Sequence, residues 1–104
     1  MLIYNVTTHV EPSIEQEWLL WMKEEHLPKM VKTGCFLKAK LFKVITDQDQ
    51  GGISYATQYH CSSRKEYEDY IALHAKALRQ DAIERFGNTI LAFRTQLEEI
   101  TTVA

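Results

Sequence analysis

The chain has 104 residues, of which 45% are hydrophobic and 25% are charged, and its formal net charge is −2. This length suits one ordinary core, and the composition is globular rather than disordered or fibrous. Lys and Arg are scattered among at least as many carboxylates, which disfavours a nucleic-acid partner. We therefore expect a single domain over residues 1–104.

The hydrophobic runs disfavour a membrane partner. The N-terminal segment MLIYNVTTHV lacks the positive and long apolar regions of a signal peptide, and no run approaches the roughly 18 apolar residues of a spanning helix. We expect a cytoplasmic protein. The only cysteines, Cys35 and Cys61, have no CxxC partner, so we expect two reduced thiols that fill positions on strands.

A strand and a helix are the first predicted elements. Val, Ile, Thr and Tyr alternate roughly from Leu2 to Val10, which predicts a strand that ends before Pro12. Pro12 and Ser13 then open a helix, with Ser13 as its N-cap and Gln16 at the capping-box position. The stripe at helical spacing that follows consists of Ile14, Trp18, Trp21, Met22 and Glu25.

Pro28 limits this first helix. Proline lacks the amide hydrogen for a helical bond, and its ring disfavours the α conformation at the residue before it. We expect the helix to end or kink near His26. A short turn should follow, with one restarted helical turn over residues 29–32 and with Gly34 redirecting the chain.

The middle of the chain predicts a β-hairpin. Residues 35–45 form a long strand pattern that is largely apolar on both faces. Asp47, Asp49 and the Gly pair at 51–52 predict the hairpin tip, and Ile53 to Cys61 predicts the second strand.

A second helix and a last strand complete the pattern. Ser63 and Glu66 form a capping box at the start of a helix that continues to Phe86. The stripe of this helix includes Tyr67, Tyr70, Ile71, His74, Ala77 and Leu78. Gly87 ends the helix, and Thr89 to Ile100 alternates as the last strand.

The order strand, helix, hairpin, helix, strand predicts the fold class. It is typical of an α+β, ferredoxin-like βαββαβ domain, in which a four-stranded antiparallel sheet carries two helices on one face. The other sheet face would be bare although its side chains are largely apolar, so we expect a second copy to cover it and form a dimeric α/β barrel. The alternative is a monomer whose Lys38, Lys40 and Lys43 extend over the open sheet to solvent.

Three segments resemble a known family. They are residues 18–36 (WLLWMKEEHLPKMVKTGCF), 51–59 (GGISYATQY) and 74–98 (HAKALRQDAIERFGNTILAFRTQLE). Together they resemble an uncharacterised bacterial family of unknown function within the dimeric α/β-barrel superfamily. That superfamily includes cofactor-free quinol monooxygenases, muconolactone isomerases, polyketide cyclases and haem-degrading enzymes, so a shared fold implies no shared reaction. The resemblance implies a ligand pocket between the helices and the sheet of one subunit.

Two shorter resemblances concern individual residues. The run from His26 to Pro28 resembles the His-x-Pro that several barrel families carry where the first helix leaves the sheet. In the haem-degrading branch, an Asn on the first strand and a His on the second helix frame the porphyrin, and Asn5 and His74 stand at comparable positions. Those enzymes also use a Trp on the second helix, where this chain has Tyr70. Haem is therefore a lesser alternative to a protein without a cofactor.

His26 and His74 are the candidate acid–base residues. His26 is expected near a helix C-terminus, where unpaired carbonyls favour the imidazolium, so it either serves as a general acid or base or caps those carbonyls. His74 shares a stripe with residues that should face the sheet. It is expected to hydrogen-bond a Tyr hydroxyl in the core or to enter a pocket. Its companions in that pocket would be Tyr67, Tyr70 and either Asn5 or Tyr4.

Arg94 and the two tryptophans are further candidates. Arg94 on the last strand either faces the dimer seam or anchors a carboxylate or phenolate in the pocket. Trp18 and Trp21 are core residues or pocket wall. No two of the four histidines lie at i, i+3 or i+4 on one helix, so no metal site is expected.

These residues lead to one hypothesis and two alternatives. The leading hypothesis is a protein that binds a small, largely apolar or aromatic molecule and acts as a cofactor-free isomerase, cyclase or monooxygenase on an enolisable or phenolic substrate. The first alternative is a non-enzymatic homodimeric assembly or regulatory module, whose interior its own side chains fill. The second is haem binding or degradation. An open cavity that both histidines reach would favour the leading hypothesis.

Overall fold

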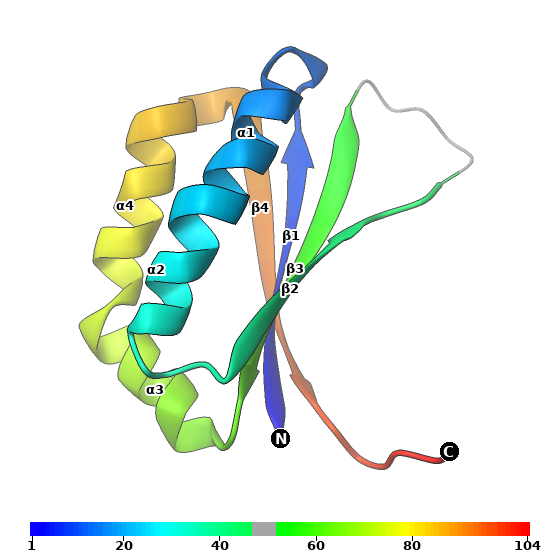
Figure 1. Ribbon diagram of the computed structural model, residues 1–104, viewed down its shortest axis with the longest axis vertical. Helices are drawn as coiled ribbons and strands as arrows, with labels where there is room; N and C mark the ends of the chain where they lie inside the picture. The colour runs from blue at the N-terminus through cyan, green and yellow to red at the C-terminus, as the bar shows by residue number, and fades with distance from the viewer. Residues whose placement is uncertain (47–51) are drawn as a thin grey trace.

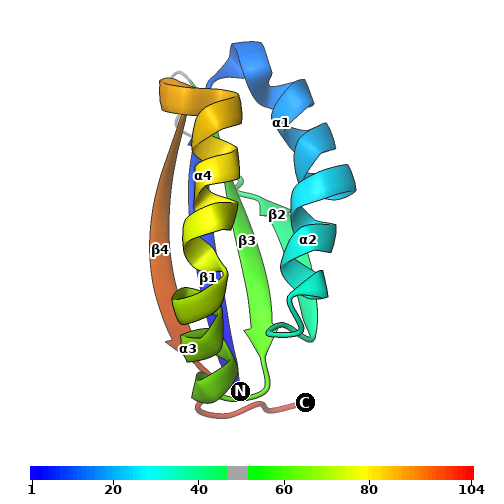
Figure 2. The ribbon, with the colours of Figure 1, turned by 90° about the vertical axis from the view of Figure 1, so that its left-hand side faces the viewer.

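The computed structural model describes residues 1–46 and 52–104. Its strands form one four-stranded sheet in the order β2-β3-β1-β4, and every neighbouring pair is antiparallel. The helices all lie on one side of this sheet (Figures 1 and 2). The predicted α+β, ferredoxin-like architecture is therefore confirmed. The predicted hairpin tip at Asp47, Asp49 and Gly51 lies outside the described residues.

The two central strands have the predicted bounds. β1 is Leu2–Val10 and β3 is Ile53–Cys61, and they pair with Tyr4 opposite Tyr59. Burial alternates along most of both strands, because successive side chains of a strand point to opposite faces. The face that contains Tyr4 and Tyr59 is the one that the helices cover.

The two outer strands are shorter than the sequence pattern indicated. β2 is Lys38–Lys43, whereas a strand was expected over residues 35–45. β4 is Ile90–Glu98, whereas a strand was expected over residues 89–100. Cys35 is buried in the core before β2 begins, because the chain there is still crossing from the helix to the sheet.

The first helical segment continues past Pro28 without the expected end or short turn, although its α-helical hydrogen bonding is interrupted over residues 22–26 and restarts at Leu27. It runs without a turn through η1 (Pro12–Ile14), α1 (Glu15–Trp21), η2 (Met22–His26) and α2 (Leu27–Lys32). η2 is a π-helical turn, whose wider hydrogen-bonding pattern accommodates a proline that an α-helical turn would not. The expected cap is also wrong, because Ser13 lies inside η1 and Glu11 is the N-cap residue without a side-chain cap bond.

The second helical segment is broken at His74, where one continuous helix was expected. α3 spans Arg64–Leu73 and α4 spans Ala75–Phe86, and His74 between them has φ −128°. Hydrogen bonding still crosses the break, because the His74 amide donates to the Tyr70 carbonyl at 2.9 Å and the Leu78 amide donates to the His74 carbonyl at 3.2 Å.

The ends of this segment were predicted better than its interior. Ser63 is the N-cap residue of α3, and its hydroxyl donates to the Glu66 carboxylate rather than capping the backbone. Gly87 follows α4 with φ 55°, a left-handed conformation that glycine adopts without a steric penalty. A short turn, η3 (Gly87–Thr89), then leads into β4.

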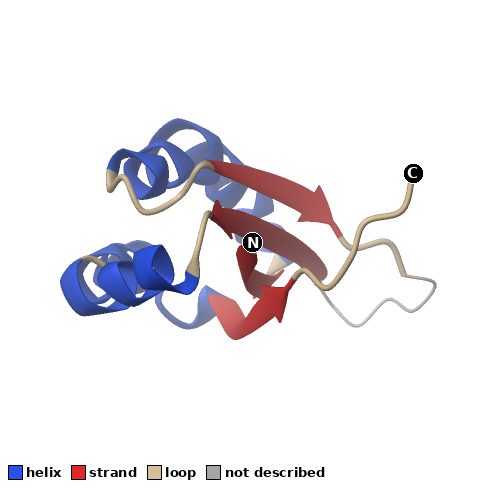
Figure 3. Ribbon diagram, turned by 90° about the horizontal axis from the view of Figure 1, so that it is seen from below, coloured by secondary structure: helices blue, strands red, loops and turns tan. Residues whose placement is uncertain are grey.

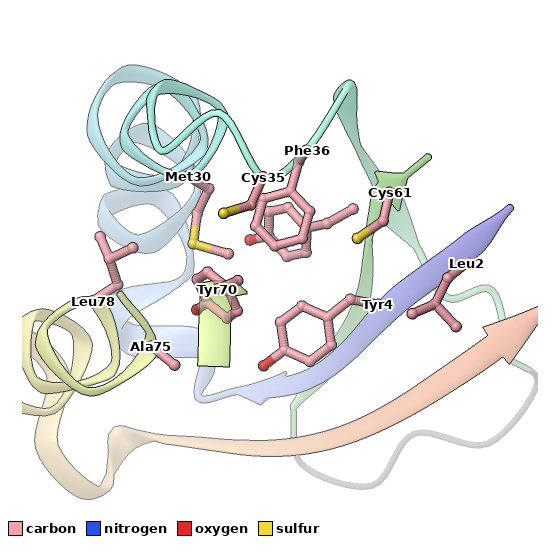
Figure 4. Close-up of a cluster of buried hydrophobic side chains, with 10 residues drawn as sticks. Leu2, Tyr4, Met30, Cys35, Phe36, Cys61, Tyr70, Ala75 and Leu78 are labelled. Carbon is pink, nitrogen blue, oxygen red and sulfur yellow. The ribbon is translucent and has the colours of Figure 1, made fainter. Parts of the chain in front are cut away.

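Aromatic packing around Tyr4 forms the centre of the core. The Tyr4 ring centroid lies 5.7 Å from that of Tyr59, 5.3 Å from Tyr67 and 5.6 Å from Tyr70. Phe36 closes the cluster, with its ring 5.2 Å from Tyr59 and 5.0 Å from Tyr70. Figure 4 shows Tyr4, Phe36 and Tyr70 gathered between the strands and the helices. These contacts tie β1 to β3, to α3 and to the segment between α2 and β2.

The helices leave the opposite face of the sheet uncovered (Figure 3). The centre of this open face is more polar than expected. Asn5 lies on this face, and its side-chain amide donates to the hydroxyls of Thr7 and Thr95 at 3.3 Å each. Lys38 and Lys40 of β2 also lie there. The exposed large apolar side chains of this face belong to the outer strands and are Phe42, Leu91, Phe93 and Leu97. We call these four the outer apolar residues.

Replacing Phe36 by Ala is expected to lower the free energy of unfolding by about 3–5 kcal/mol, because it leaves a cavity in the aromatic cluster. Phe36 is 4% exposed, whereas its neighbour Leu37 is 62% exposed. Leu37→Ala is therefore a matched control, with an expected change of about 0.5 kcal/mol or less. Urea denaturation followed by circular dichroism measures both. Similar losses in the two variants would contradict this placement of the core.

Candidate functional site

A cavity of about 230 Å³ lies between the helices and the sheet. Side chains of β1, β3 and β4 form one side of it, and side chains of both helical segments form the other. Its apolar wall includes Trp18, Trp21, Met22, Met30 and Leu78. Its polar wall includes Tyr4, His26, Thr57, Tyr59, Tyr70, Arg79 and Arg94.

The cavity reaches solvent between α4 and β4. Most of its lining residues are buried or half-buried. The exposed ones are Ile83 on α4, Gly87 in the turn that follows, and Leu91 and Arg94 on β4. A ligand would therefore enter past Arg94, with the tryptophans of the first helical segment at the inner wall.

His26 is the last residue of η2 and lies against the inner wall. Its ring stacks on Trp21 with centroids 4.6 Å apart, and its Nδ1 is buried without a hydrogen-bond partner among the described residues. Burial lowers the pKa of His26 to about 4, the Asp81 carboxylate opposes this shift, and the Lys29 ammonium adds to it. The expected imidazolium at a helix C-terminus is thus wrong, because the helix continues to Lys32 and His26 is neutral near pH 7.

Two guanidinium groups line the cavity. One Nη of Arg79 donates to the Tyr4 hydroxyl at 3.1 Å, while its Nε is buried without a partner in the described chain. Arg94 stands opposite Val6 on the helix-covered side of the sheet, so of its two expected places it takes the one in the pocket. The lining residues include no Asp and no Glu. The wall therefore carries two positive charges and no negative one.

The phenols and one hydroxyl add hydrogen-bond donors to this wall. Burial raises the pKa of Tyr59 and Tyr70 above the usual range, neighbouring phenols raise it further, and Arg94 opposes the shift. Both phenols therefore stay protonated near neutral pH and can donate. The Thr57 hydroxyl is buried on the same wall and has no partner among the residues that the structure describes.

Most of the predicted site residues line this cavity, namely Tyr4, Trp18, Trp21, His26, Tyr70 and Arg94. Asn5, Tyr67 and His74 do not line it. Asn5 lies on the opposite sheet face, and Tyr67 packs at the edge of the core against the Tyr4 ring. His74 lies at the break between α3 and α4, outside the cavity wall. The expected pair of imidazoles is therefore not brought together.

The sequence analysis missed Arg79, Thr57 and Tyr59, although the sequence holds a signal for each. Arg79 follows Ala75 at i+4 and precedes Ala82 at i+3, which is the spacing of the buried helix face. Thr57 and Tyr59 alternate along β3, so they share the helix-covered face. Arg79 could have been predicted as a site residue because it is a charged residue within an otherwise apolar helical stripe.

The fold and the cavity define an α+β protein with a ferredoxin-like sheet and a cavity beneath its helices. A family described as a domain of unknown function, DUF4286, matches residues 1–100 of the chain. The chain belongs to this family, which confirms the resemblance to an uncharacterised family. No curated protein matches the chain.

Solved structures share this fold at low sequence identity. A dimeric ferredoxin-like protein from an uncultured marine organism superposes with a TM-score of 0.74 at 15% identity, over 98% of this chain and 97% of that one. An ethyl tert-butyl ether D (EthD) family protein from Bacillus halodurans C-125 gives 0.67 at 15% identity, over 96% and 100%. A second dimeric ferredoxin-like marine protein gives 0.67 at 11% identity, over 100% and 99%. These superpositions establish the shared fold.

None of the helices within residues 1–46 and 52–104 is long and apolar enough to cross a membrane. No group of three or more His, Cys, Asp and Glu side chains there is placed to hold a metal ion. Cys35 and Cys61 are free, buried thiols, and burial raises the pKa of Cys61 to about 11.

The free energy of unfolding is expected to fall as the pH decreases from 6.5 to about 4, because unfolded His26 binds a proton in this range and folded His26 does not. His26→Gln removes this contribution. Across this pH range, the free energy of unfolding of the wild type should fall by up to about 3 kcal/mol more than that of the variant. Urea unfolding at a series of pH values measures the difference. A pH-independent difference between wild type and His26→Gln would contradict the burial of a neutral His26.

Proposed function

We propose that the protein is a homodimer that binds a small, largely apolar or aromatic molecule in the cavity of each subunit. The observation that carries the proposal is a set of polar atoms without partners in the described chain. These atoms are the Nδ1 of His26, the Oγ1 of Thr57 and the Nε of Arg79, and all three residues line the cavity. Buried polar groups are almost always hydrogen-bonded, so three such atoms in residues that line the cavity support a bound molecule or ordered water at this wall.

Pairing through the open sheet face is the first part of the proposal. Two of the similar structures are dimeric ferredoxin-like proteins. This chain exposes all four outer apolar residues on the sheet face that its helices leave open. Leu91 and Phe93 are 58% and 60% exposed. A second copy would remove this apolar area from water, which favours association through a twofold contact. Lys43 lies opposite Tyr55 and so on the helix-covered side, which leaves Lys38 and Lys40 to solvate the open face of a monomer.

Phe93→Glu is expected to convert the dimer into a monomer, because it places a charge within the proposed interface. The measurement is the molar mass from size-exclusion chromatography with light scattering at micromolar concentration. Leu73→Glu is the matched control, because Leu73 is 73% exposed on α3, which lies on the other side of the sheet, and this variant should stay dimeric. A wild-type protein that has the mass of one chain would refute the pairing.

The second part of the proposal is that the cavity holds a ligand. An interior filled by the protein's own side chains would favour an assembly or regulatory module, but about 230 Å³ between helices and sheet is not filled. The tryptophans and phenols of the wall suit a flat apolar molecule, and the few polar groups suit its orientation. Ligand binding is therefore favoured over the module.

Catalysis by a cofactor-free isomerase, cyclase or monooxygenase has narrower support. The wall contains the imidazole of His26 but not that of His74, so the expected acid–base pair is not available. Neutral His26 can accept a proton from a phenolic hydroxyl or from a carbon beside a carbonyl, and its imidazolium can return that proton to the product. Its low pKa makes it a weak base. Binding rather than turnover is therefore the function that we propose.

The haem alternative does not fit the residues that suggested it. Asn5 lies on the sheet face away from the cavity, and His74 lies outside the cavity wall. The residues of the chain that resembled the haem-degrading branch are thus not arranged around one space.

Ala82→Phe is expected to abolish binding of phenol, a probe for a small aromatic ligand, because the added ring fills the cavity that Ala82 lines. Millimolar phenol added to the wild type should shift the amide NMR signals of lining residues, and the variant should show no such shifts. Ala77→Phe is the control, because Ala77 is exposed on the same helix. Shifts confined to residues outside the wall, or equal shifts in Ala82→Phe, would refute the cavity as the binding site.

A further inference from the structure

We propose that the cavity selects aromatic carboxylates and that the guanidinium groups of Arg79 and Arg94 bind the carboxylate. This inference rests on the proposed function, since it specifies the ligand of the same cavity. It goes further because it assigns the ligand a charge, a functional group and a size, and because it gives Arg79 a role that the sequence analysis did not foresee.

Unbalanced charge is the first reason. The lining residues include both arginines but no carboxylate, and neither arginine forms an ion pair within the described chain. Arg85 on the same helix as Arg79 provides the contrast, because it pairs with Glu17 and Glu25 at 3.8 Å each on the surface. Two guanidinium groups on a cavity wall that has no carboxylate give this wall a net positive charge, which favours a bound anion.

The two arginines act on one region of the wall. Both lie close enough to the Tyr70 hydroxyl to oppose the rise in its pKa, and one Nη of Arg79 donates to the neighbouring Tyr4 hydroxyl. The phenol of Tyr70 remains a donor beside them. A group bound here therefore meets N–H and O–H donors from several directions. An ionised carboxylate has two oxygens that accept only, which matches such a set.

The size and shape of the cavity select the rest of the ligand. A cavity of about 150 Å³ in another protein binds benzene, so about 230 Å³ suits one ring with a small substituent. Trp18 and Trp21 supply flat apolar walls for that ring. A benzoic acid is ionised at neutral pH, whereas a simple phenol, with a pKa near 10 like that of Tyr, is not. The carboxylate is therefore the anion that a small aromatic molecule most readily brings to these arginines.

Benzoate is expected to bind the wild-type protein about ten times more tightly than benzamide. The two probes share a ring and a planar substituent, but only benzoate forms charge-assisted hydrogen bonds with guanidinium groups. Isothermal titration calorimetry at pH 7 gives both dissociation constants. Phenol serves as the third probe, and phenol binding tighter than that of benzoate would overturn the choice of carboxylate.

Variants of Arg94 test the assignment to named residues. Arg94→Gln should weaken benzoate binding about tenfold and change benzamide binding about twofold or less. Arg94→Lys keeps the positive charge but lacks the paired N–H donors of a guanidinium group. Its affinity for benzoate should therefore lie between those of the wild type and Arg94→Gln. Arg79→Gln should act in the same direction. Arg85→Gln is the matched control and should bind benzoate like the wild type, because Arg85 does not line the cavity.

The outcomes separate this inference from the proposed function. Equal affinity for benzoate and benzamide, or unchanged benzoate binding by Arg94→Gln, would overturn the carboxylate site while binding of the neutral probes still supports the cavity. If benzoate, benzamide and phenol all leave the NMR signals of the lining residues unchanged, the proposed function itself fails. Selective benzoate binding that depends on Arg94 but not on Arg85 would support both.

Discussion

The packing of Tyr4 connects the core of this protein to its cavity. Its ring lies at the centre of the aromatic cluster, and its hydroxyl accepts a hydrogen bond from Arg79 on the cavity wall. β1 is a central strand with a partner on each side, so the backbone of Tyr4 is held from both directions. Arg79 is therefore positioned before any ligand binds, and such preorganisation reduces the entropy lost on binding.

The distribution of charge separates the surface from the cavity. Surface cations such as Lys29, Lys65 and Arg85 pair with carboxylates on the helices, where solvent makes such pairs weak contributors to stability. The cavity cations have no such partners. Because the surface pairs are weak, two arginines without a carboxylate on a cavity wall are more informative about function than the surface pairs are.

The agreement between expectation and structure was best where local pattern and long-range pairing coincide. β1 and β3 were predicted to the residue, since both are central strands whose alternation reflects one covered face. The expected end of the first helix was wrong because proline usually breaks an α-helix, and local rules do not include the π-helical turn that accommodates it. His74 was expected on the stripe of one straight helix, but the helix is broken at this residue and His74 does not line the cavity.

The sequence by itself determined the order of the elements, the ferredoxin-like fold and the aromatic wall of the cavity, because alternation and helical spacing record which side of each element is buried. Only the tertiary structure decided which polar residues share one space. It separated His26 from His74, turned Asn5 to the open sheet face and placed Arg79 and Arg94 on the wall of one cavity. The physical reason is that strand register and helix packing decide which residues far apart in sequence come together. No local sequence pattern encodes the register or the packing.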